Sequence, residues 1–454
     1  MTTPFWTLDR VAAALADEAT TRPPRGPVPL RAVSTDTRKI ETGDLFVALA
    51  GEHFDAHDFL AEAVAKGAAA VVVSDASRAA ALGVPVYETR DTLVALGALA
   101  RWRRRAWGKP VVGIAGSNGK TSTKELTKAA LGAVLRVHAT EGNLNNRVGV
   151  PLTLLALPDE ADIAIVELGT NVPGELATVR AIAEPELAVV TCIAEEHLEG
   201  FGDLAGVLRE ESDAFDGAAV AITPAAQPEV GGAARGRARR VVSAGLDAGD
   251  LRASRWEIAA DGLGWIEVEG VMVRPPARGA HNLRNAMLAL AVARECGISL
   301  DDAARGIAAM PQPKMRSAWE PLGRGILIND AYNANPGSTR AALEMLAAVG
   351  DGRQRVAVLG TMREMGAQAR RVHGEIAREV VASPIEVIAG IGEFAAALRE
   401  AGGADPRVVT APDIDELWPL LEPRLAADAV ILLKASRGMK LERLVPSLTA
   451  WASR

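Results

Sequence analysis

Short apolar runs alternate with helical patterns along the chain, and this alternation predicts strands separated by helices. In the first hundred residues, apolar runs at 44–49 and 68–73 flank a helical pattern at 59–66, and a helix rich in leucine, alanine and arginine is predicted at 91–107. Buried strands that alternate with helices are typical of α/β proteins. We therefore assign residues 1–107 to a first α/β block.

The same alternation defines two further blocks, residues 108–312 and 313–454. The second block contains apolar runs at 111–115, 163–167 and 187–193, a helical pattern at 120–134 and an antiparallel excursion at 256–273. The third block contains apolar runs at 326–330, 356–359, 387–389, 408–410 and 430–433, with helical stretches between them. We expect a parallel sheet in each block, with ligands gathered at the carboxyl ends of the strands.

Composition excludes several classes of protein. The 454 residues are 49% hydrophobic, 24% charged and only 4% aromatic, which favours helices packed on sheets over an aromatic-rich β-sandwich. The net charge of −7 and the lack of a dense block of Lys and Arg argue against nucleic-acid binding. Because the sequence shows neither a signal-peptide core nor a membrane-spanning apolar stretch, we expect a cytoplasmic protein without membrane insertion. We also expect it to act as a monomer.

A glycine-rich loop joins the strand at 111–115 to the helix that follows it. Glycines at 113, 116 and 119 precede Lys120, Thr121 and Ser122, although the usual phosphate-loop spacing would place a glycine at Ile114. Glycines let backbone N–H groups face phosphates, a lysine can reach the β and γ oxygens, and a threonine hydroxyl can bind magnesium. The variant loop therefore predicts a nucleoside triphosphate with Mg²⁺, in preference to a plain turn before a helix.

Polar residues follow several of the other strands. Glu167 ends the strand at 163–167, where a carboxylate can hold Mg²⁺ or simply face solvent. His197 follows the strand at 187–193 and is compatible with a ligand or with a surface residue. Lys434 ends a strand of the third block, where its charge would attract a carboxylate or phosphate group. These positions suggest a polar cluster at the sheet edge.

Taken together, the motifs resemble those of the Mur ligases, the ATP-dependent amino-acid and peptide ligases of peptidoglycan precursor synthesis. The matching segments lie in order along nearly the whole chain, at 35–38, 43–49, 54–59, 116–124, 141–151, 167–169, 197–202, 281–282, 330–336 and 434–437. The runs at 55–59 and 197–202 favour the branch that adds a dipeptide. The resemblance implies that ATP and Mg²⁺ support the joining of D-alanyl-D-alanine to UDP-N-acetylmuramoyl-tripeptide through an acyl phosphate.

The resemblance also implies an architecture and a set of site residues. Residues 1–107 would form an α/β UDP-binding domain, 108–312 a central P-loop ATPase-like parallel-sheet domain, and 313–454 a Rossmann-like domain. The ATP-binding residues would be Gly116, Ser117, Asn118, Gly119, Lys120, Thr121, Ser122, Asn282, Arg316 and Asp330. The substrate-binding residues would be Ser34, Thr35, Asp36, Arg38, Asn145, Asn146, Thr170, Asn333, Asn335 and Lys434.

The catalytic residues implied by the resemblance include one departure from the family pattern. Lys120 would bind the phosphates, Thr121 and Glu167 one magnesium ion, and His197 a second. The family usually has a carbamylated lysine at the position of Glu211, so we expect the Glu211 carboxylate to supply the negative charge near the second cation. The third block departs from the family pattern at two positions: Asn329 and Thr361 stand where the family often has aspartates. A stretch at 223–226 lacks the usual Asn-Ala-Asp.

Two other interpretations remain open from the sequence. One is a sibling ligase that adds a single amino acid or extends folate with glutamate. The other is a nucleotide-gated ATPase switch without acyl transfer, against which the three-block architecture argues.

Overall fold

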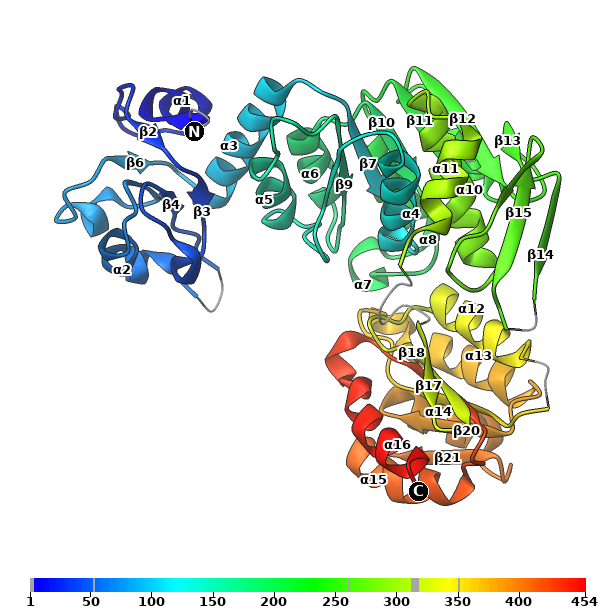
Figure 1. Cartoon of the computed structure of the whole chain (residues 1–454). Helices are drawn as coiled ribbons and strands as arrows, with labels where there is room; N and C mark the ends of the chain where they lie inside the picture. Colours follow the sequence, from blue (N-terminus) through cyan, green and yellow to red (C-terminus); the bar gives the residue numbers. More distant parts are fainter. Residues whose placement is uncertain (1–3, 52–53, 260, 312–317, 350–351) are drawn as a thin grey trace. The chain divides into compact units, whose positions relative to one another are not determined.

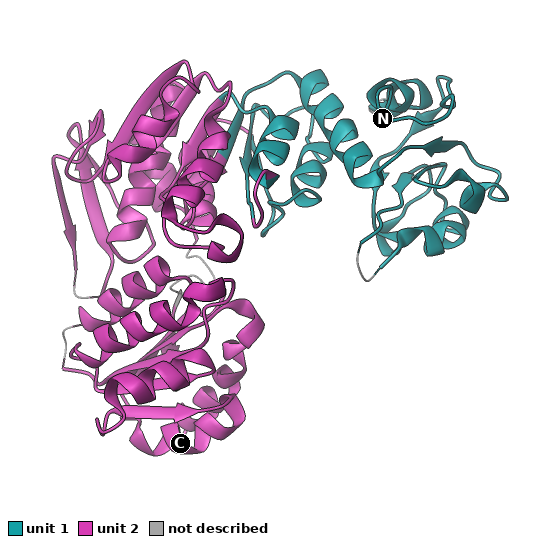
Figure 2. Ribbon diagram, turned by 180° about the vertical axis from the view of Figure 1, so that it is seen from behind, with its two compact units in different colours: residues 1–113, 137–170, 175–186 teal, residues 114–136, 171–174, 187–454 magenta. Residues whose placement is uncertain are grey.

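The computed structural model describes residues 4–51, 54–259, 261–311, 318–349 and 352–454 (Figure 1). The chain forms two compact units (Figure 2). Unit 1 comprises residues 1–113, 137–170 and 175–186, and unit 2 comprises residues 114–136, 171–174 and 187–454. The strand β7 (Val111–Ala115) begins in unit 1 and ends in unit 2.

Unit 1 contains a parallel sheet of four strands in the order β3-β4-β5-β6. Its helices and strands are β1 (Trp6–Thr7), α1 (Leu8–Ala14), β2 (Pro29–Leu30), β3 (Val33–Ser34), β4 (Leu45–Val47), α2 (Leu60–Ala65), β5 (Ala70–Val73), β6 (Val86–Glu88), α3 (Thr92–Trp107), β8 (Val137–Ala139), α5 (Gly149–Leu155), β9 (Ile163–Glu167) and α6 (Glu175–Ala183). Apolar residues of β4 and β5 alternate between the two sheet faces, so that α1 and α3 bury one face and α2 the other. The strands β8 and β9 pair in parallel and place Glu167 at a carboxyl end.

The first part of unit 2 carries four strands of the central seven-stranded sheet, β10 to β13, as successive parallel neighbours. Its helices and strands are α4 (Lys120–Gly132), β10 (Leu187–Val190), α7 (Leu198–Phe201), α8 (Leu204–Ser212), β11 (Val220–Pro224), α9 (Pro228–Ala234), β12 (Arg240–Gly245), β13 (Leu251–Arg252), β14 (Arg255–Ile258), β15 (Gly264–Val268), β16 (Val271–Val273), α10 (Ala280–Glu295) and α11 (Leu300–Ala308). The strands β14 to β16 form an antiparallel meander. The helix α10 is buried along most of its length and packs against α4.

The second part of unit 2 is a six-stranded sheet in the order β17-β18-β22-β19-β20-β21. Its helices and strands are β17 (Ala318–Leu322), β18 (Gly325–Asp330), α12 (Pro336–Ala347), β19 (Arg355–Leu359), α13 (Ala369–Val381), β20 (Val387–Ile391), α14 (Glu393–Gly402), β21 (Val408–Ala411), α15 (Ile414–Leu421), β22 (Val430–Lys434) and α16 (Val445–Ala452). All pairs are parallel except β17 with β18. Helices α12, α13 and α14 cover one face, and α15 and α16 cover the other.

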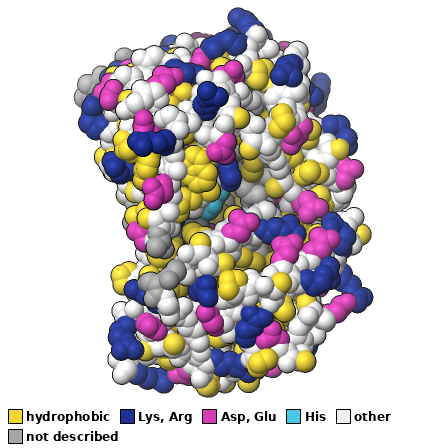
Figure 3. All heavy atoms as spheres, turned by 90° about the vertical axis from the view of Figure 1, so that its right-hand side faces the viewer, with side chains coloured by type: hydrophobic (Ala, Val, Ile, Leu, Met, Phe, Trp, Pro, Cys, Tyr) yellow, Lys and Arg dark blue, Asp and Glu magenta, His cyan; other side chains and the backbone are white. Residues whose placement is uncertain are grey.

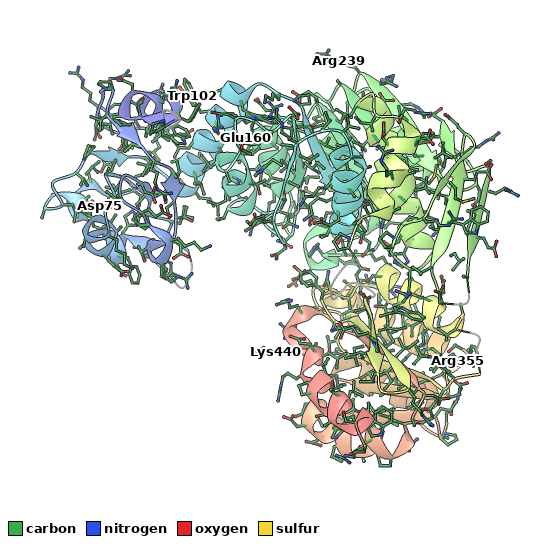
Figure 4. All side chains as sticks on the ribbon, in the orientation of Figure 1. Asp75, Trp102, Glu160, Arg239, Arg355 and Lys440 are labelled. Atoms are coloured by element: carbon green, nitrogen blue, oxygen red, sulfur yellow. The ribbon has the colours of Figure 1, made fainter. Side chains whose placement is uncertain are left out.

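The strand order places three polar loops at one edge of this sheet. Because β18, β22 and β19 are parallel neighbours, the loops that follow Asp330, Lys434 and Leu359 leave the sheet at the same end. Arg355, labelled in Figure 4, lies at the opposite end of β19, where its guanidinium binds the carboxylate of Glu386 at 2.7 Å. We call the end from which the three loops leave the polar edge; it is the carboxyl end of the strands, where ligands of open α/β sheets usually bind.

The predicted α/β class is confirmed, and most predicted elements are present. The strands β7 and β9 have the predicted bounds, and the excursion at 256–273 is the β14–β16 meander. Strand β17 was not predicted; Pro321 lies within it, which is compatible with its position at the sheet edge. Among the residues described, no helix has both the length and the apolar character needed to span a membrane. On the face shown in Figure 3, basic and acidic side chains are interspersed.

Candidate functional site

The glycine-rich loop turns from β7 into the N-terminus of α4. Gly116 has a φ of +116°, and a Cβ atom there would lie 2.3 Å from Thr191 Oγ1, so no larger residue fits without movement. Gly119 has a φ of +81° and caps α4 without a side chain. The loop therefore brings backbone N–H groups and the positive end of a thirteen-residue helix to one place, which is an anion-binding arrangement.

Residues that follow β10 hold the loop in this conformation. Ser117 Oγ accepts a hydrogen bond from the Ala194 N–H at 2.9 Å, and the Thr191 hydroxyl donates to the Asn118 carbonyl at 2.5 Å. The Lys120 ammonium donates to the Gly116 carbonyl, which folds the side chain back over the loop. Thr121 and Ser122 occupy the first turn of α4.

Two buried carboxyl groups lie beside this loop. Glu211, on α8, is 1% exposed, and its Oε2 accepts the Gly116 N–H at 2.6 Å. Its other oxygen, Oε1, is buried and has no hydrogen-bond partner. Glu196 is buried as well. Glu196 was missed as a site residue, because the sequence Glu195-Glu196-His197 does not show which carboxylate turns inward.

Burial dominates the electrostatics of these two groups. It raises the pKa of Glu211 to about 8; the negative charge of Glu196 adds to the rise, whereas Lys120 and the Gly116 N–H oppose it. Burial likewise raises the pKa of Glu196, against the opposing charge of Lys120. A further positive charge at this position would stabilise both carboxylates.

The carboxylates are suited to a hard divalent cation. The unpartnered Glu211 Oε1 offers an oxygen ligand, and Mg²⁺ is usually held by one or two carboxylates together with substrate phosphates and water. Within the described part of the chain, no group of three or more His, Cys, Asp or Glu residues forms a complete metal site by itself. The residues present thus fit an ion that binds together with a nucleotide.

His197 is the N-cap of α7 and lies in the left-handed backbone region, with a φ of +46°. Its Nδ1 contacts the carboxylate of Glu364, and its Nε2 lies 3.9 Å from Glu196 Oε2. The imidazole therefore lies between Glu364, in the loop after β19, and the buried carboxyl group of Glu196.

Two amides on α10 lie on another side of the loop. Asn282 donates from Nδ2 to the Arg278 carbonyl at 2.8 Å, and Asn285 donates to Asn282 Oδ1 at 3.3 Å. A Cβ on Gly119 would lie 2.8 Å from Asn285 Oδ1, which places this residue against the loop. Burial lowers the pKa of the neighbouring His281 to about 4, so its ring is neutral near pH 7.

The polar edge of the C-terminal sheet contains four of the predicted residues. The Lys434 ammonium donates to Asp330 Oδ2 at 2.6 Å and to the Asn333 carbonyl at 2.8 Å. Asn335 caps α12 in a reciprocal capping box with Ser338, and its Nδ2 donates to Asn118 Oδ1 at 2.8 Å. The cap of α12 thus contacts the glycine-rich loop directly. The predicted residue Arg316 lies outside the described residues.

In unit 1, the predicted residues form two separate groups. Glu167 is 1% exposed and accepts a hydrogen bond from Asn145 Nδ2 at 2.9 Å, while Thr170, three residues further on, is also buried. Asn146 Oδ1 accepts the backbone N–H of Gly149 at 2.9 Å, at the start of α5. The Asn145 amide therefore orients the Glu167 carboxylate.

The second group in unit 1 lies in a short loop after β3. Ser34 Oγ accepts the backbone N–H of Asp36 at 3.3 Å, and Arg38 pairs with both oxygens of Asp36 at 2.8 Å. Hydrogen bonds from Arg38 lower the pKa of the Asp36 carboxyl to about 2. Thr35, between Ser34 and Asp36, is partly exposed.

Comparison with known proteins gives matches along most of the chain. Three family models match, described as Mur ligase family, catalytic domain (residues 29–104), Mur ligase middle domain (114–293) and Mur ligase, glutamate ligase domain (316–437). The UDP-N-acetylmuramoyl-tripeptide--D-alanyl-D-alanine ligase of Escherichia coli is 36% identical, over 93% of this chain and 94% of the relative.

Solved structures give the same result. MurF from Acinetobacter baumannii is 30% identical, with a TM-score of 0.90 over 98% of this chain and 99% of that one. MurF ligase from Thermotoga maritima, solved in complex with ADP, shares the fold at 24% identity, with a TM-score of 0.81 over 93% of this chain and 98% of that one.

Proposed function

The chain belongs to the Mur ligase family, and on that premise we propose that it joins D-alanyl-D-alanine to UDP-N-acetylmuramoyl-tripeptide with cleavage of ATP to ADP and phosphate. The observation that carries this proposal is the end-to-end similarity to the E. coli ligase of that name. Cytoplasmic ATP would be the nucleotide source, so we place the enzyme in the cytoplasm. Its action as a monomer stays a prediction from the sequence.

The chemistry begins with an unreactive carboxylate. An oxygen of the terminal carboxylate of the tripeptide attacks the γ-phosphorus of ATP, and the bond from that phosphorus to the ADP oxygen breaks. The amine of D-alanyl-D-alanine then attacks the carbonyl carbon of the acyl phosphate. The tetrahedral intermediate expels phosphate, which carries away the former carboxylate oxygen, and the amine loses a proton. An amide, ADP and phosphate result.

Residues of the phosphate loop stabilise the charge that develops in these steps. The N–H groups of the loop from Gly116 and the N-terminus of α4 would bind the β and γ phosphates, and the Lys120 ammonium would neutralise the transferring group. We assign the nucleotide to Gly116, Ser117, Asn118, Gly119, Lys120, Thr121, Ser122, Asn282, Arg316 and Asp330. Magnesium, when bound, supplies Lewis-acid stabilisation of phosphoryl oxygens.

The cation ligands that we propose come from the family pattern and from this chain's own departure from it. Thr121 and Glu167 would serve one ion. His197 and Glu211 would serve a second, with the buried Glu211 carboxylate in the role that a carbamylated lysine has in relatives. Its unpartnered Oε1 supports this role. The free carboxylate needs no carbon dioxide, so the enzyme would work without bicarbonate.

The remaining assignments follow the three blocks. Residues 1–107 would hold the UDP end through Ser34, Thr35, Asp36 and Arg38. Asn145, Asn146 and Thr170 would contact the sugar-peptide in the central block, residues 108–312. Asn333, Asn335 and Lys434, in residues 313–454, would contact the dipeptide.

A panel of amines tests this function against the sibling ligases. The purified protein, ATP, Mg²⁺ and UDP-N-acetylmuramoyl-tripeptide are incubated separately with D-alanyl-D-alanine, single amino acids and glutamate, and products are identified by mass. We expect amide formation with D-alanyl-D-alanine and phosphate release only when both substrates are present. Extension by a single amino acid would favour a sibling ligase, and phosphate release without either substrate would favour an ATPase switch.

A further inference from the structure

The contact between His197 and Glu364 joins two distant parts of unit 2. His197 begins α7 in the nucleotide-binding part, whereas Glu364 follows β19 in the C-terminal sheet. Both residues have positive φ angles, +46° for His197 and +65° for Glu364. Such angles are uncommon for residues other than glycine and persist where the surrounding structure requires them. The backbone at both residues is therefore held in an uncommon conformation by its surroundings.

The contact places a carboxylate oxygen of Glu364 against one nitrogen of the His197 ring, Nδ1. His197 Nδ1 contacts Glu364 Oε2, and because a carboxylate oxygen is an acceptor, a proton on Nδ1 makes this contact a hydrogen bond. A proton on Nδ1 leaves the lone pair of a neutral imidazole on Nε2. That nitrogen lies 3.9 Å from Glu196 Oε2, on the side of the buried carboxyl groups.

Neighbouring contacts dock the two segments around this pair. Arg371 binds Glu195 at 3.1 Å, and a Cβ on Gly366 would lie 3.1 Å from the Cα of Glu199. The helix α7 also packs against the 3₁₀ turn at Gly366–Gln368. The Glu364 carboxylate therefore reaches His197 only while the loop after β19 is docked on α7.

We propose that Glu364 is a positioning residue, which holds the His197 ring with Nε2 directed at the second cation and so makes this ligand depend on docking of the C-terminal sheet. The inference rests on the proposed function in one respect, namely that His197 binds that cation. Second-sphere carboxylates that accept the other N–H of a ligating histidine commonly fix its tautomer and orientation. Glu364 would do so across two parts of the chain.

The first test observes the ring directly, without substrate, nucleotide or metal. In protein labelled with nitrogen-15 histidine, the His197 resonances are assigned with a His197→Gln variant. We expect the Nδ1–H tautomer in the wild type and in Glu364→Gln, whose amide oxygen can still accept the proton. We expect Glu364→Ala to lose this preference. Glu379→Ala is the matched control, because it removes a carboxylate of α13 that pairs with Arg340 instead.

The second test measures how nucleotide binding depends on magnesium. ADP affinity is titrated against Mg²⁺ concentration for the same variants. We expect Glu364→Ala to need an Mg²⁺ concentration at least about tenfold higher than the wild type for the same gain in ADP affinity, while its ADP affinity without metal is unchanged. We expect the Mg²⁺ requirement of Glu364→Gln to lie close to that of the wild type. An unaltered tautomer in Glu364→Ala, or an unaltered Mg²⁺ requirement, would overturn the proposal. Neither the tautomer nor the Mg²⁺ dependence of ADP binding requires the enzyme to form an amide. Both results could therefore be interpreted even if the enzyme formed no product with the amines tested above.

Discussion

Replacement of Lys120 by alanine is expected to lower kcat for ligation by about 10²–10³-fold or more. The ammonium lies over the phosphate loop, bonded to the Gly116 carbonyl, and is the positive charge that opposes the raised pKa of both Glu196 and Glu211. Its removal takes away the charge proposed to lie at the transferring phosphoryl group, and it removes the largest favourable interaction of two buried carboxyl groups. Coupled phosphate-release kinetics at saturating substrates measure the loss.

A second lysine of the same helix separates this effect from a general change in charge. Lys128 is exposed on α4, two turns after Lys120, so Lys128→Ala should retain wild-type kcat and thermal stability. If Lys120→Ala stayed within about tenfold of Lys128→Ala, the assignment of Lys120 to phosphoryl transfer would be wrong.

Replacement of Glu211 by glutamine is expected to lower kcat by about 10²-fold and to raise the Mg²⁺ concentration needed for half-maximal activity. The amide can still accept the Gly116 N–H through its oxygen, so the loop should keep its conformation. The charge next to the proposed second cation is lost, and an NH₂ group would stand where the unpartnered Oε1 now offers a lone pair. Initial rates across a Mg²⁺ series measure both effects.

The Glu211→Lys variant makes the test sharper. If Glu211 takes the place of a carbamylated lysine, the lysine variant should be inactive in bicarbonate-free buffer and regain activity as bicarbonate is added. Wild-type activity should not respond to bicarbonate. Glu229→Gln, which alters an exposed carboxylate of α9, is the surface control. Full activity and ordinary Mg²⁺ dependence in Glu211→Gln would contradict the assigned role.

The sequence was sufficient to predict the local features of the site. The predicted first and last residues of β7 and β9 agree with the structure. A buried parallel strand is a continuous apolar run, and in both cases glycine or charged residues mark where the run ends. The order of strand, glycines, lysine and hydroxyl located the glycine-rich turn from β7 into α4, since each step of that motif has a local physical reason. The role of this turn in phosphate binding stays a prediction.

Features that depend on contacts across the chain could not be predicted. Glu196 is buried, and the next residue, His197, has a left-handed backbone that its local propensity does not encode. Glu364 lies far from His197 in sequence and meets it only through docking of the C-terminal sheet. Asn335 was predicted as a substrate contact. The hydrogen bond that its Nδ2 donates to Asn118 Oδ1, from the cap of α12, required the tertiary structure.

Transfer of oxygen-18 tests the central claim, ligation through an acyl phosphate, most directly. UDP-N-acetylmuramoyl-tripeptide is labelled in both oxygens of its reacting carboxylate and incubated with the enzyme, ATP, Mg²⁺ and D-alanyl-D-alanine, and the phosphate released is analysed by mass spectrometry. The account predicts one oxygen-18 in phosphate for every amide bond formed. Amide formation with unlabelled phosphate, or phosphate release without any amide product, would contradict it.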